Sequence, residues 1–342
     1  MRRIFVVGGA GFIGSHFLDA LLARRETESV AVFDNFSSGQ EWHYAHHRGD
    51  TRLRVVRGDV KDLPALKEAM APVGGKPYDA VIHLASNPDI AKAMTDPTVD
   101  FWEGTYLTQN VAEAVRTSLV KTVLYASGSG IYGDVGKLEA SELGILRDEQ
   151  GKVVASDRAD APIHPPVSTY GASKQAGEGI FASYAAMFDI SAIAFRFGNV
   201  VGPRQTHGVG YDFVRRLKAD PTKLRVLGDG TQSKSYIYVT DVVAAVLLAG
   251  EKLGGRPGAF DVYNVATGDY ITVKEIADLA VEVAGLKPGA VKYEFSGGNR
   301  GWKGDVPVVR LNTARIQTLG WRCSRTSRQA LKDSMTAMLG EL

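Results

Sequence analysis

Short runs of β-branched and other apolar residues alternate with amphipathic segments through the first two thirds of the chain. Apolar runs predict strands at residues 3–7, 30–33, 53–57, 80–84, 121–126 and 191–197. Segments with helical periodicity lie between most of them, at residues 13–24, 63–70, 99–116 and 170–187. Since alternating strands and helices form right-handed crossovers, the pattern predicts an α/β fold with a doubly wound parallel sheet.

Beyond residue 203 the predicted elements become shorter. Helices are predicted at residues 211–218, 273–284, 313–319 and 327–339, while a strand at 235–239 and the helix from Asp241 are interpreted as a return to the first domain. We therefore predict a first domain of residues 1–202 with a return segment near 233–250. A smaller, discontinuous α/β domain would comprise residues 203–232 and 251–342.

The stretch of residues 133–168 is long and irregular for a compact domain. Its centre, residues 146–154, has a charged turn between apolar residues, which predicts a short hairpin. One hypothesis is that the stretch covers a bound substrate or contacts a partner subunit. The alternative is a surface insertion with no role.

Composition excludes several classes of function. The 342 residues carry a formal net charge of only +2, so no overall basic field would attract nucleic acid or a membrane surface. The single cysteine, Cys323, excludes an internal disulfide, and no apolar run is long enough to span a membrane, so a cytoplasmic protein is expected. His43, His46 and His47 lack a neighbouring carboxylate or cysteine pattern, so they are expected to be surface residues rather than metal ligands.

The first predicted strand runs directly into a glycine-rich turn, Gly8-Gly9-Ala10-Gly11-Phe12-Ile13-Gly14, which opens a helix. Glycines in this position permit a tight turn and let backbone N–H groups approach a pyrophosphate at the helix N-terminus. Asp34 ends the second strand twenty residues after Gly14, where an acid can accept hydrogen bonds from ribose hydroxyls. Because its charge would repel a 2′-phosphate, the pattern favours NAD over NADP.

In order and spacing, these and later motifs resemble the extended short-chain dehydrogenase/reductase family, specifically its nucleotide-sugar epimerases and dehydratases. The motifs are Asp34-Asn35 with Ser37-Ser38-Gly39, Gly58-Asp59-Val60, His83-Leu84-Ala85, Tyr132-Gly133, Tyr170-Gly171-Ala172-Ser173-Lys174, Arg196 with Asn199, and Gly228-Asp229-Gly230-Thr231-Gln232. The segment from Asn299 to Asp305 is most similar to epimerases of the UDP-glucose 4-epimerase type. The resemblance covers nearly the whole chain and implies a Rossmann-type NAD-binding domain with a nucleotide-sugar-binding domain.

The resemblance implies NAD as the cofactor. The residues implied to hold it are Gly8, Gly11, Phe12, Ile13, Gly14, Asp34, Asn35, Phe36, Ser37, Ser38, Gly39, Asp59, Val60, Leu84, Ala85, Ser86, Tyr170, Lys174 and Phe197.

Tyr170 and Lys174 are four residues apart and therefore share one face of the predicted helix. In the family, this tyrosine is the acid and base for the sugar hydroxyl, and the lysine binds the nicotinamide ribose and lowers the pKa of the tyrosine. A phenol with a pKa near ~10 becomes a usable base only where positive charge favours its phenolate.

Two positions depart from the family pattern. Where the family has Ser or Thr four residues before the Tyr132-Gly133 pair, this chain has Gly128, so Ser129, or alternatively Ser127, is expected to supply the hydroxyl. Many relatives carry Asn where this chain has Gly104. Both departures put the efficiency or the type of reaction in question.

The resemblance also implies a set of residues for the nucleotide diphosphate and its base. Asn199 would contact the diphosphate, and Arg225, Val226 and Leu227 belong to the segment that flanks the base. Lys234 stands where an arginine clamp is usual, so it keeps the charge but loses the bidentate geometry, and Arg300 is the other clamp candidate.

These observations predict NAD-dependent epimerisation of a UDP- or dTDP-linked sugar through a transient 4-keto intermediate. Ser129 and Gly130 lack the acidic pair of a 4,6-dehydratase and the Glu usual in a decarboxylase. The alternatives that stay open are a nucleotide-sugar 4-dehydrogenase, a dehydratase or decarboxylase, and a catalytically silent NAD-binding regulatory protein. By family resemblance, the chain is expected to form a homodimer through the helices at 99–116 and 170–187.

Overall fold

The predicted parallel sheet is present in the computed structural model, which describes residues 1–72, 74–142, 146–155 and 165–341. The chain forms two units. Unit 1 comprises Met1–Ile131, Thr169–Arg196 and Val243–Tyr263, and unit 2 comprises Tyr132–Ser168, Phe197–Val242 and Asn264–Leu342. The stretch that rejoins unit 1 thus begins ten residues later than the expected return segment near 233–250, and residues 132–168 group with unit 2.

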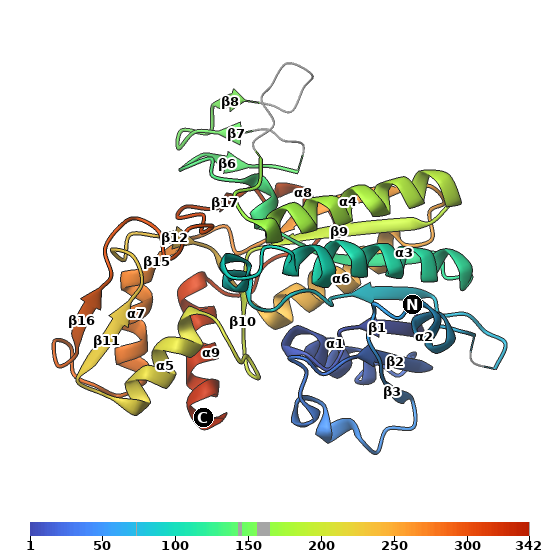
Figure 1. Ribbon diagram of the computed structural model, residues 1–342, viewed down its shortest axis with the longest axis horizontal. Helices are drawn as coiled ribbons and strands as arrows, with labels where there is room; N and C mark the ends of the chain where they lie inside the picture. The colour runs from blue at the N-terminus through green and yellow to red at the C-terminus, as the bar shows by residue number, and fades with distance from the viewer. Residues whose placement is uncertain (73, 143–145, 156–164, 342) are drawn as a thin grey trace. The chain divides into compact units, whose positions relative to one another are not determined.

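The strands and helices centred on unit 1 follow the predicted order (Figure 1). The strands are β1 (Arg3–Val7), β2 (Ser29–Asp34), β3 (Leu53–Arg57), β4 (Ala80–His83), β5 (Thr122–Gly128), β9 (Ser191–Phe197) and β14 (Phe260–Val265). The α-helices are α1 (Phe12–Leu22), α2 (Leu63–Ala69), α3 (Tyr106–Thr117), α4 (Thr169–Phe188) and α6 (Val239–Leu253). Short 3-10 turns are η1 (Glu41–His43), η2 (Ala45–His47) and η3 (Ile90–Met94), and η4 (Phe101–Thr105) is a π-helical turn.

Within the described residues, seven strands form one sheet in the order β14-β9-β5-β4-β1-β2-β3. Neighbouring strands from β3 through β5 are parallel, which confirms the doubly wound fold. The chain leaves β1 toward β2 and β3 on one side and then returns to β4 on the other. Ligands of such sheets bind outside the carboxyl ends of the strands at this reversal.

One predicted strand was placed in the wrong sheet. Residues 235–239 were expected to return to the first domain, but β13 (Tyr236–Tyr238) pairs in parallel with β10 (Asn199–Val201) in a separate two-stranded sheet. The outer position of the large sheet is taken by β14 instead, which the sequence analysis did not predict. Its first two residues are only partly buried, so the strand lacks the continuous apolar run of the inner strands.

The elements of unit 2 are shorter. They are β6 (Glu139–Ala140), β7 (Leu146–Arg147), β8 (Val153–Ala155), β10, α5 (Val209–Ala219), β11 (Lys223–Val226), β12 (Ser233–Lys234), β13, β15 (Ile271–Thr272), α7 (Val273–Val283), β16 (Lys292–Phe295), β17 (Arg310–Leu311), α8 (Ala314–Gln317) and α9 (Ser327–Glu341). The 3-10 turn η5 (Ser129–Tyr132) belongs to unit 1 except for its last residue. Helices α5, α7 and α9 share a hydrophobic core with β11, formed around Phe213, Leu224, Ile276 and Leu331. Helix α7 begins at a capping box, in which Thr272 and Glu275 bond each other's backbone N–H groups.

The hairpin predicted near residues 146–154 is confirmed by the antiparallel pairing of β7 with β8. Asp148 accepts a hydrogen bond from the backbone of Lys152 and closes its turn. Strands β6, β7 and β8 join β17 in one sheet of unit 2. Residues 143–145 and 156–164 lie outside the described residues, and the role of the stretch 133–168 as a cover stays a prediction.

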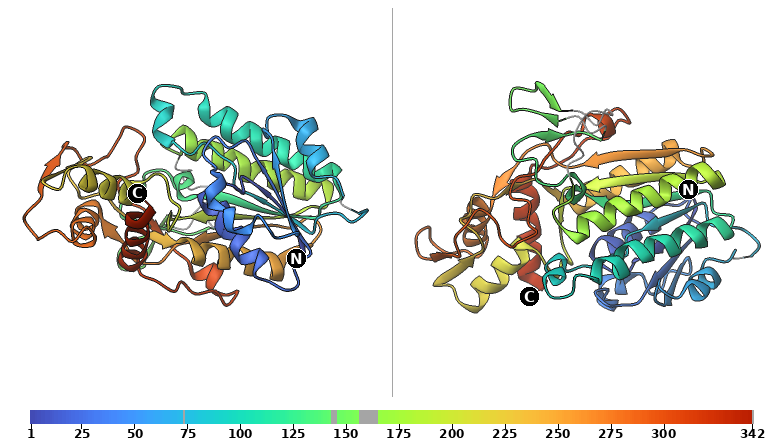
Figure 2. Two further views of the ribbon diagram at one scale, coloured as in Figure 1. Left: turned by 90° about the horizontal axis from the view of Figure 1, so that it is seen from below. Right: turned by 45° about the horizontal axis from the view of Figure 1, so that its top comes forward.

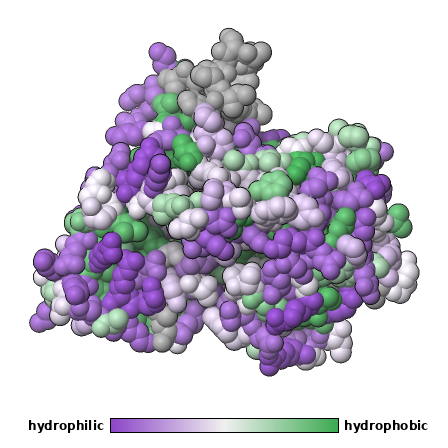
Figure 3. Space-filling model, viewed as in Figure 1, coloured by the Kyte–Doolittle hydropathy of each residue, from purple (hydrophilic) through white to green (hydrophobic). Residues whose placement is uncertain are grey.

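Two layers of helices cover the large sheet of unit 1 (Figure 2). Helices α3 and α4 lie side by side on one face, and α1 lies on the other. The helix predicted at 99–116 begins with the π-helical turn η4 before α3 continues it. Large apolar side chains remain exposed on η4 and at the end of α4. Figure 3 shows hydrophobic residues scattered among hydrophilic ones on one face of the molecule.

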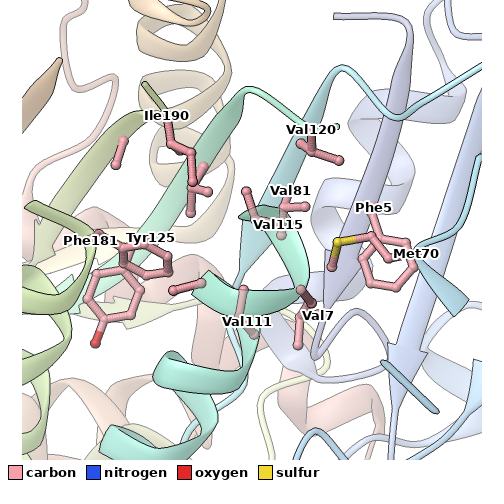
Figure 4. Packing of buried hydrophobic residues seen from close by; sticks show 14 of the residues in the cluster. Phe5, Val7, Met70, Val81, Val111, Val115, Val120, Tyr125, Phe181 and Ile190 are labelled. Atoms are coloured by element: carbon pink, nitrogen blue, oxygen red, sulfur yellow. The ribbon is translucent and has the colours of Figure 1, made fainter. Parts of the chain in front are cut away.

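The core between the sheet and α2, α3 and α4 is apolar and closely packed (Figure 4). Phe5 and Met70 lie together at one end, and Tyr125 lies beside Phe181 of α4 at the other. Gly177 of α4 rests on the Tyr125 ring. A Cβ atom there would come within 2.3 Å of the Tyr125 hydroxyl and 2.7 Å of its ring.

This contact predicts opposite effects for two glycines of the same helix. Gly177→Ala should lower the free energy of unfolding by about 1–3 kcal/mol, because a buried aromatic ring cannot move aside without strain. Gly179→Ala should raise it by about 0.5–1 kcal/mol, because no atom lies within 4 Å of the added methyl and alanine favours a helix. Urea denaturation followed by circular dichroism measures both. Equal changes in the two variants would contradict the close packing of α4 on β5.

Candidate functional site

The glycine-rich turn after β1 is built by contacts that leave no room for side chains at Gly8 and Gly14. Gly8 has a φ of +81°, and a Cβ there would come within 2.8 Å of the Ala85 backbone nitrogen. A Cβ on Gly14 would come within 2.5 Å of the Gly8 carbonyl oxygen. The turn therefore folds back tightly against the first turn of α1 and against the end of β4.

The N-terminus of α1 is suited to bind an anion. Its N-cap is Gly11, no side chain caps the helix, and no acid lies in its first turn. The free N–H groups and the helix dipole therefore point toward the turn. A Cβ on Gly11 would meet only the Gly8 oxygen, at 3.5 Å, so its lack of a side chain leaves room for a ligand. These features fit a dinucleotide pyrophosphate.

Asp34 is held at the end of β2 by backbone N–H groups. Its Oδ2 atom accepts a hydrogen bond from Ala10 N at 2.9 Å, and its Oδ1 atom accepts one from Phe36 N at 2.8 Å. Burial raises the pKa of the Asp34 carboxyl, while these two hydrogen bonds oppose that change. The carboxylate is therefore fixed beside the glycine turn, and each oxygen keeps a lone pair for a ribose hydroxyl.

Most of the other predicted cofactor residues lie in loops after the strands of unit 1. Asn35 Nδ2 lies 3.5 Å from Asp59 Oδ2, which brings the loops after β2 and β3 together. Leu84 and Ala85 follow β4 and bond the Val7 carbonyl, and Ser86 comes next. Phe197, at the end of β9, groups with unit 2 instead.

Tyr170 and Lys174 share one face of α4, as their spacing predicts. The Lys174 Nζ atom donates a hydrogen bond to the Ala126 carbonyl of β5 at 2.8 Å, and the side chain is almost completely buried. The same ammonium lies 5.5 Å from the centre of the Tyr170 ring. The pair is thus fixed by the packing of α4 on β5.

The electrostatics of the pair differ from the expectation. Burial lowers the pKa of Lys174 to about 8 and raises the pKa of Tyr170 to about 12, although the neighbouring Ser86 hydroxyl opposes the latter change. Lys174 was expected to lower the pKa of the tyrosine, but burial is the largest influence on Tyr170, and the charge of Asp100 raises its pKa further. The Ser86 hydroxyl lies near the Tyr170 phenol and, among the described residues, is buried without a hydrogen-bond partner.

The three candidate positions for the missing hydroxyl have different surroundings. A Cβ on Gly128 would lie 3.9 Å and 4.0 Å from the Tyr170 ring and hydroxyl, so this position faces the phenol with room for a side chain. Ser127 is buried, and its hydroxyl donates a hydrogen bond to Glu178 at 2.6 Å. Ser129 is partly exposed at the start of η5. Of the two predicted serines, only Ser127 is bonded to Glu178, so Ser129 is the better candidate to supply the hydroxyl.

Two buried acids near the pair were missed by the sequence analysis. Glu178 accepts both Nε and Nη2 of Arg196, at 2.9 and 2.7 Å, together with the Ser127 hydroxyl. Asp100 accepts hydrogen bonds from Asn87 and Thr169, and its charge acts on both Tyr170 and Lys174. Neither acid is part of a motif, because their neighbours come from distant parts of the chain.

Gly104 lies in the π-helical turn η4, where helix geometry brings it against α4. A Cβ there would come within 2.7 Å of the Ser173 hydroxyl, which donates its hydrogen bond to the Tyr170 carbonyl. Ser173 therefore occupies the space that an asparagine side chain at position 104 would need.

The predicted substrate residues all lie in unit 2. Asn199 uses its side-chain amide to bond the Ser235 carbonyl at 3.1 Å. In the segment expected to flank the base, Arg225 is exposed, Val226 is buried and Leu227 is exposed. Their contact with a nucleotide stays a prediction.

Both predicted diphosphate clamps have carboxylate partners within unit 2. Lys234 pairs with Asp305 at 2.5 Å, and Arg300 pairs with Asp134 while also donating to the Asp305 carbonyl. A diphosphate would have to compete with these acids for the cations.

One prediction about the histidines was wrong. His43 is completely buried rather than exposed, because its Nδ1 atom bonds the Ala10 carbonyl of the glycine turn at 2.8 Å. The imidazole is thus part of the support of the turn. Of its neighbours, His46 is exposed and His47 is partly exposed.

The amino-acid sequence matches a known family of enzymes. Residues 4–266 match the model of the NAD dependent epimerase/dehydratase family. The chain belongs to this family. It is 30% identical over 328 residues to the UDP-glucose 4-epimerase of Mycolicibacterium smegmatis, covering 94% of this chain and 93% of that protein.

Solved structures of family members have the same fold. A UDP-galactose 4-epimerase is 35% identical, with a TM-score of 0.81 and 99% of both chains covered. A complex of the Thermus thermophilus UDP-glucose 4-epimerase with NAD is 29% identical, with a TM-score of 0.80, covering 99% of this chain and 100% of that one. NAD is therefore the cofactor that the glycine turn and Asp34 fit. Among the described residues, no helix has the length and apolar character needed to cross a bilayer.

Asp34 predicts the choice between the two nicotinamide dinucleotides. NAD should bind at least ~10²-fold more tightly than NADP, because the fixed carboxylate repels a 2′-phosphate. Asp34→Ser should narrow this ratio, while Asp96→Ser, at a partly exposed acid of the same unit, should leave it unchanged. Calorimetric titration measures the affinities of parent and variants for both dinucleotides. Equal affinities of the parent protein for NAD and NADP would contradict this role.

Proposed function

We propose that this protein is an NAD-dependent UDP-sugar 4-epimerase. The observation that carries the proposal is the Tyr170–Lys174 pair, held by α4 against the same sheet whose first turn fits NAD. The relatives named UDP-glucose 4-epimerase and UDP-galactose 4-epimerase support the choice of reaction and of substrate class. The proposed site residues are those assigned from the resemblance, with Tyr170 as the acid and base.

The chemistry requires reversible oxidation at C4 of the sugar. NAD, held by the glycine turn and Asp34, would supply the acceptor and donor of the hydride, and its oxidised ring would add positive charge to the site. Tyr170 would take the proton of the 4-hydroxyl and give it back after the sugar has turned its other face. Lys174, fixed by the Ala126 carbonyl, would hold the ribose and stabilise the phenolate.

Asn199, Lys234 and Arg300 are proposed to bind the diphosphate, and the segment from Arg225 to Leu227 to flank the base. The ion pairs of Lys234 and Arg300 with carboxylates keep these cations in place within unit 2 before a phosphate competes for them.

We also propose that the protein is a homodimer. Large apolar side chains are exposed on η4 and at the end of α4, the region expected to pair: Phe101, Trp102, Met187 and Phe188 are 51%, 48%, 71% and 36% exposed. The two pairs lie at opposite ends of α4, because Asp100 of the η4 segment bonds Thr169 at the start of the helix, so an association surface would extend along its length.

Removing the phenol hydroxyl tests the proposed reaction. With UDP-glucose or UDP-galactose, the parent protein should form the C4 epimer, detected by proton NMR, without net formation of NADH. Tyr170→Phe should lower turnover by ~10²–10⁴-fold, because the acid and base is lost, while NAD binding persists. Near-normal turnover by this variant would remove Tyr170 from the mechanism, and loss of water or carbon dioxide from the substrate would favour a dehydratase or decarboxylase.

Gly128 provides a test of the catalytically silent alternative. Gly128→Ser should raise turnover by about 10-fold, because a hydroxyl placed beside the phenol can bond the substrate oxygen in the transition state. Gly130→Ser is the matched control, since its Cβ would lie 3.5 Å from Gly171 and 4.0 Å from Cδ1 of the Tyr170 ring, whereas only the Gly128 Cβ has the phenol hydroxyl among its nearest atoms. A parent protein without activity that gains it only in Gly128→Ser would identify a silent NAD-binding protein. Equal effects of both substitutions would contradict the assigned place of the hydroxyl.

A further inference from the structure

A second cluster of chemically active side chains lies in unit 1, on the opposite end of α1 from the glycine turn. Asp19 of α1, and His46 and His47 of the turn η2, bring one ligand atom each within 4.8 Å of one another. The Nε2 atoms of His46 and His47 lie 2.7 and 2.8 Å from the same oxygen, Oδ1 of Asp19. The carboxylate that the sequence around the histidines lacks is thus supplied from 27 residues earlier in the chain.

Both sides of this cluster are rigidly supported. Asp19 lies within a helix, and the turn that carries the two histidines is anchored by its buried neighbours, His43 and Tyr44. The backbone N–H of His47 also bonds the Tyr44 carbonyl at 2.9 Å. The three ligand atoms are therefore held near one another before any ion arrives, which reduces the ordering cost of binding.

The distances are close to those of a metal centre. In a tetrahedral site with bonds of about 2.0–2.1 Å, two ligand atoms are roughly 3.3 Å apart, so each nitrogen would have to move from the oxygen by only about half an ångström. The two rings already lie side by side, with centroids 4.1 Å apart. When an ion binds, the hydrogen bonds between each histidine and Asp19 are replaced by bonds from these side chains to the ion.

The ligand types select the class of ion. Two imidazoles and one carboxylate suit Zn²⁺ and the neighbouring late first-row divalent ions, whereas Ca²⁺ and Mg²⁺ require mostly oxygen ligands. His16 Nδ1 lies 3.7 Å from the other oxygen of Asp19, Oδ2, so it stands beside the carboxylate rather than among the three ligand atoms. His46 is 52% exposed, so solvent can reach a fourth position.

We propose that Asp19, His46 and His47 form a binding site for one Zn²⁺ or a similar divalent transition-metal ion. The ion connects α1 to the turn that follows β2, two elements that also support the glycine turn and Asp34. Its effect is on the folded state rather than on hydride or proton transfer: an ion that binds the folded chain stabilises it. The site is independent of the proposed epimerase reaction.

The test uses full-length protein without a histidine tag, treated with a chelator and then dialysed. Calorimetric titration with Zn²⁺ should show one equivalent bound per chain, and Co²⁺ should give a visible absorption spectrum typical of nitrogen and oxygen ligands at low coordination number. One equivalent of Zn²⁺ should also raise the thermal unfolding midpoint. Asp19→Asn, His46→Ala and His47→Ala should each weaken binding by at least ~10-fold, since each removes one of three ligands.

The matched controls are His207→Ala and Asp278→Asn, the same substitutions at exposed residues of unit 2, which should bind Zn²⁺ like the parent protein. Circular dichroism and NAD affinity verify that the three ligand variants are folded. The proposal is overturned if the parent binds no ion, if binding is weak and exceeds one equivalent, or if the ligand variants bind as tightly as the controls. Epimerase activity does not enter these readouts, so failure of either proposal is recognised separately.

Discussion

The close approach of α4 to β5 is the constraint on which the rest of the site depends. Gly177 allows it, because the helix backbone rests directly on the Tyr125 ring at that point. One turn earlier, Lys174 can then reach the Ala126 carbonyl, and Tyr170 comes to face Gly128 of the same strand. A side chain at Gly177 would separate helix and strand and move both functional groups, although neither touches Gly177.

The close packing of α4 on β5 also buries charged side chains, which need hydrogen-bond or ion-pair partners. Glu178 follows Gly177 and accepts three hydrogen bonds, two from Arg196 and one from Ser127, so that β5, α4 and β9 are joined at one carboxylate. Such a group is costly to bury alone, and a fully bonded set of this kind favours one alignment of the three elements. This explains why Ser127, which is adjacent to the expected position of a catalytic hydroxyl, is not free to supply it.

Much of the sheet could be predicted from the sequence, because its inner strands are continuous apolar runs and its helices have a clear period. The strand β14 could not, since its first residues are partly buried and its pattern is weak. The glycine turn, Asp34 and the Tyr170–Lys174 pair were predictable because each depends on a local spacing. The burial of His43, the acids Asp100 and Glu178, and the meeting of Asp19 with His46 and His47 depend on contacts between distant segments, which spacing does not encode.

The raised pKa of Tyr170 limits the conditions under which the phenol can lose its proton. With a pKa of about 12, only about one phenol in 10⁵ is ionised at pH 7. The Ser86 hydroxyl does not overcome the effect of burial, and the nearby charge of Asp100 also opposes ionisation. A bound oxidised nicotinamide, the cofactor that the fold fits, would add the positive charge that favours the phenolate. In the proposed reaction, burial of the phenol would therefore couple ionisation of Tyr170 to the presence of oxidised cofactor, which is also the hydride acceptor.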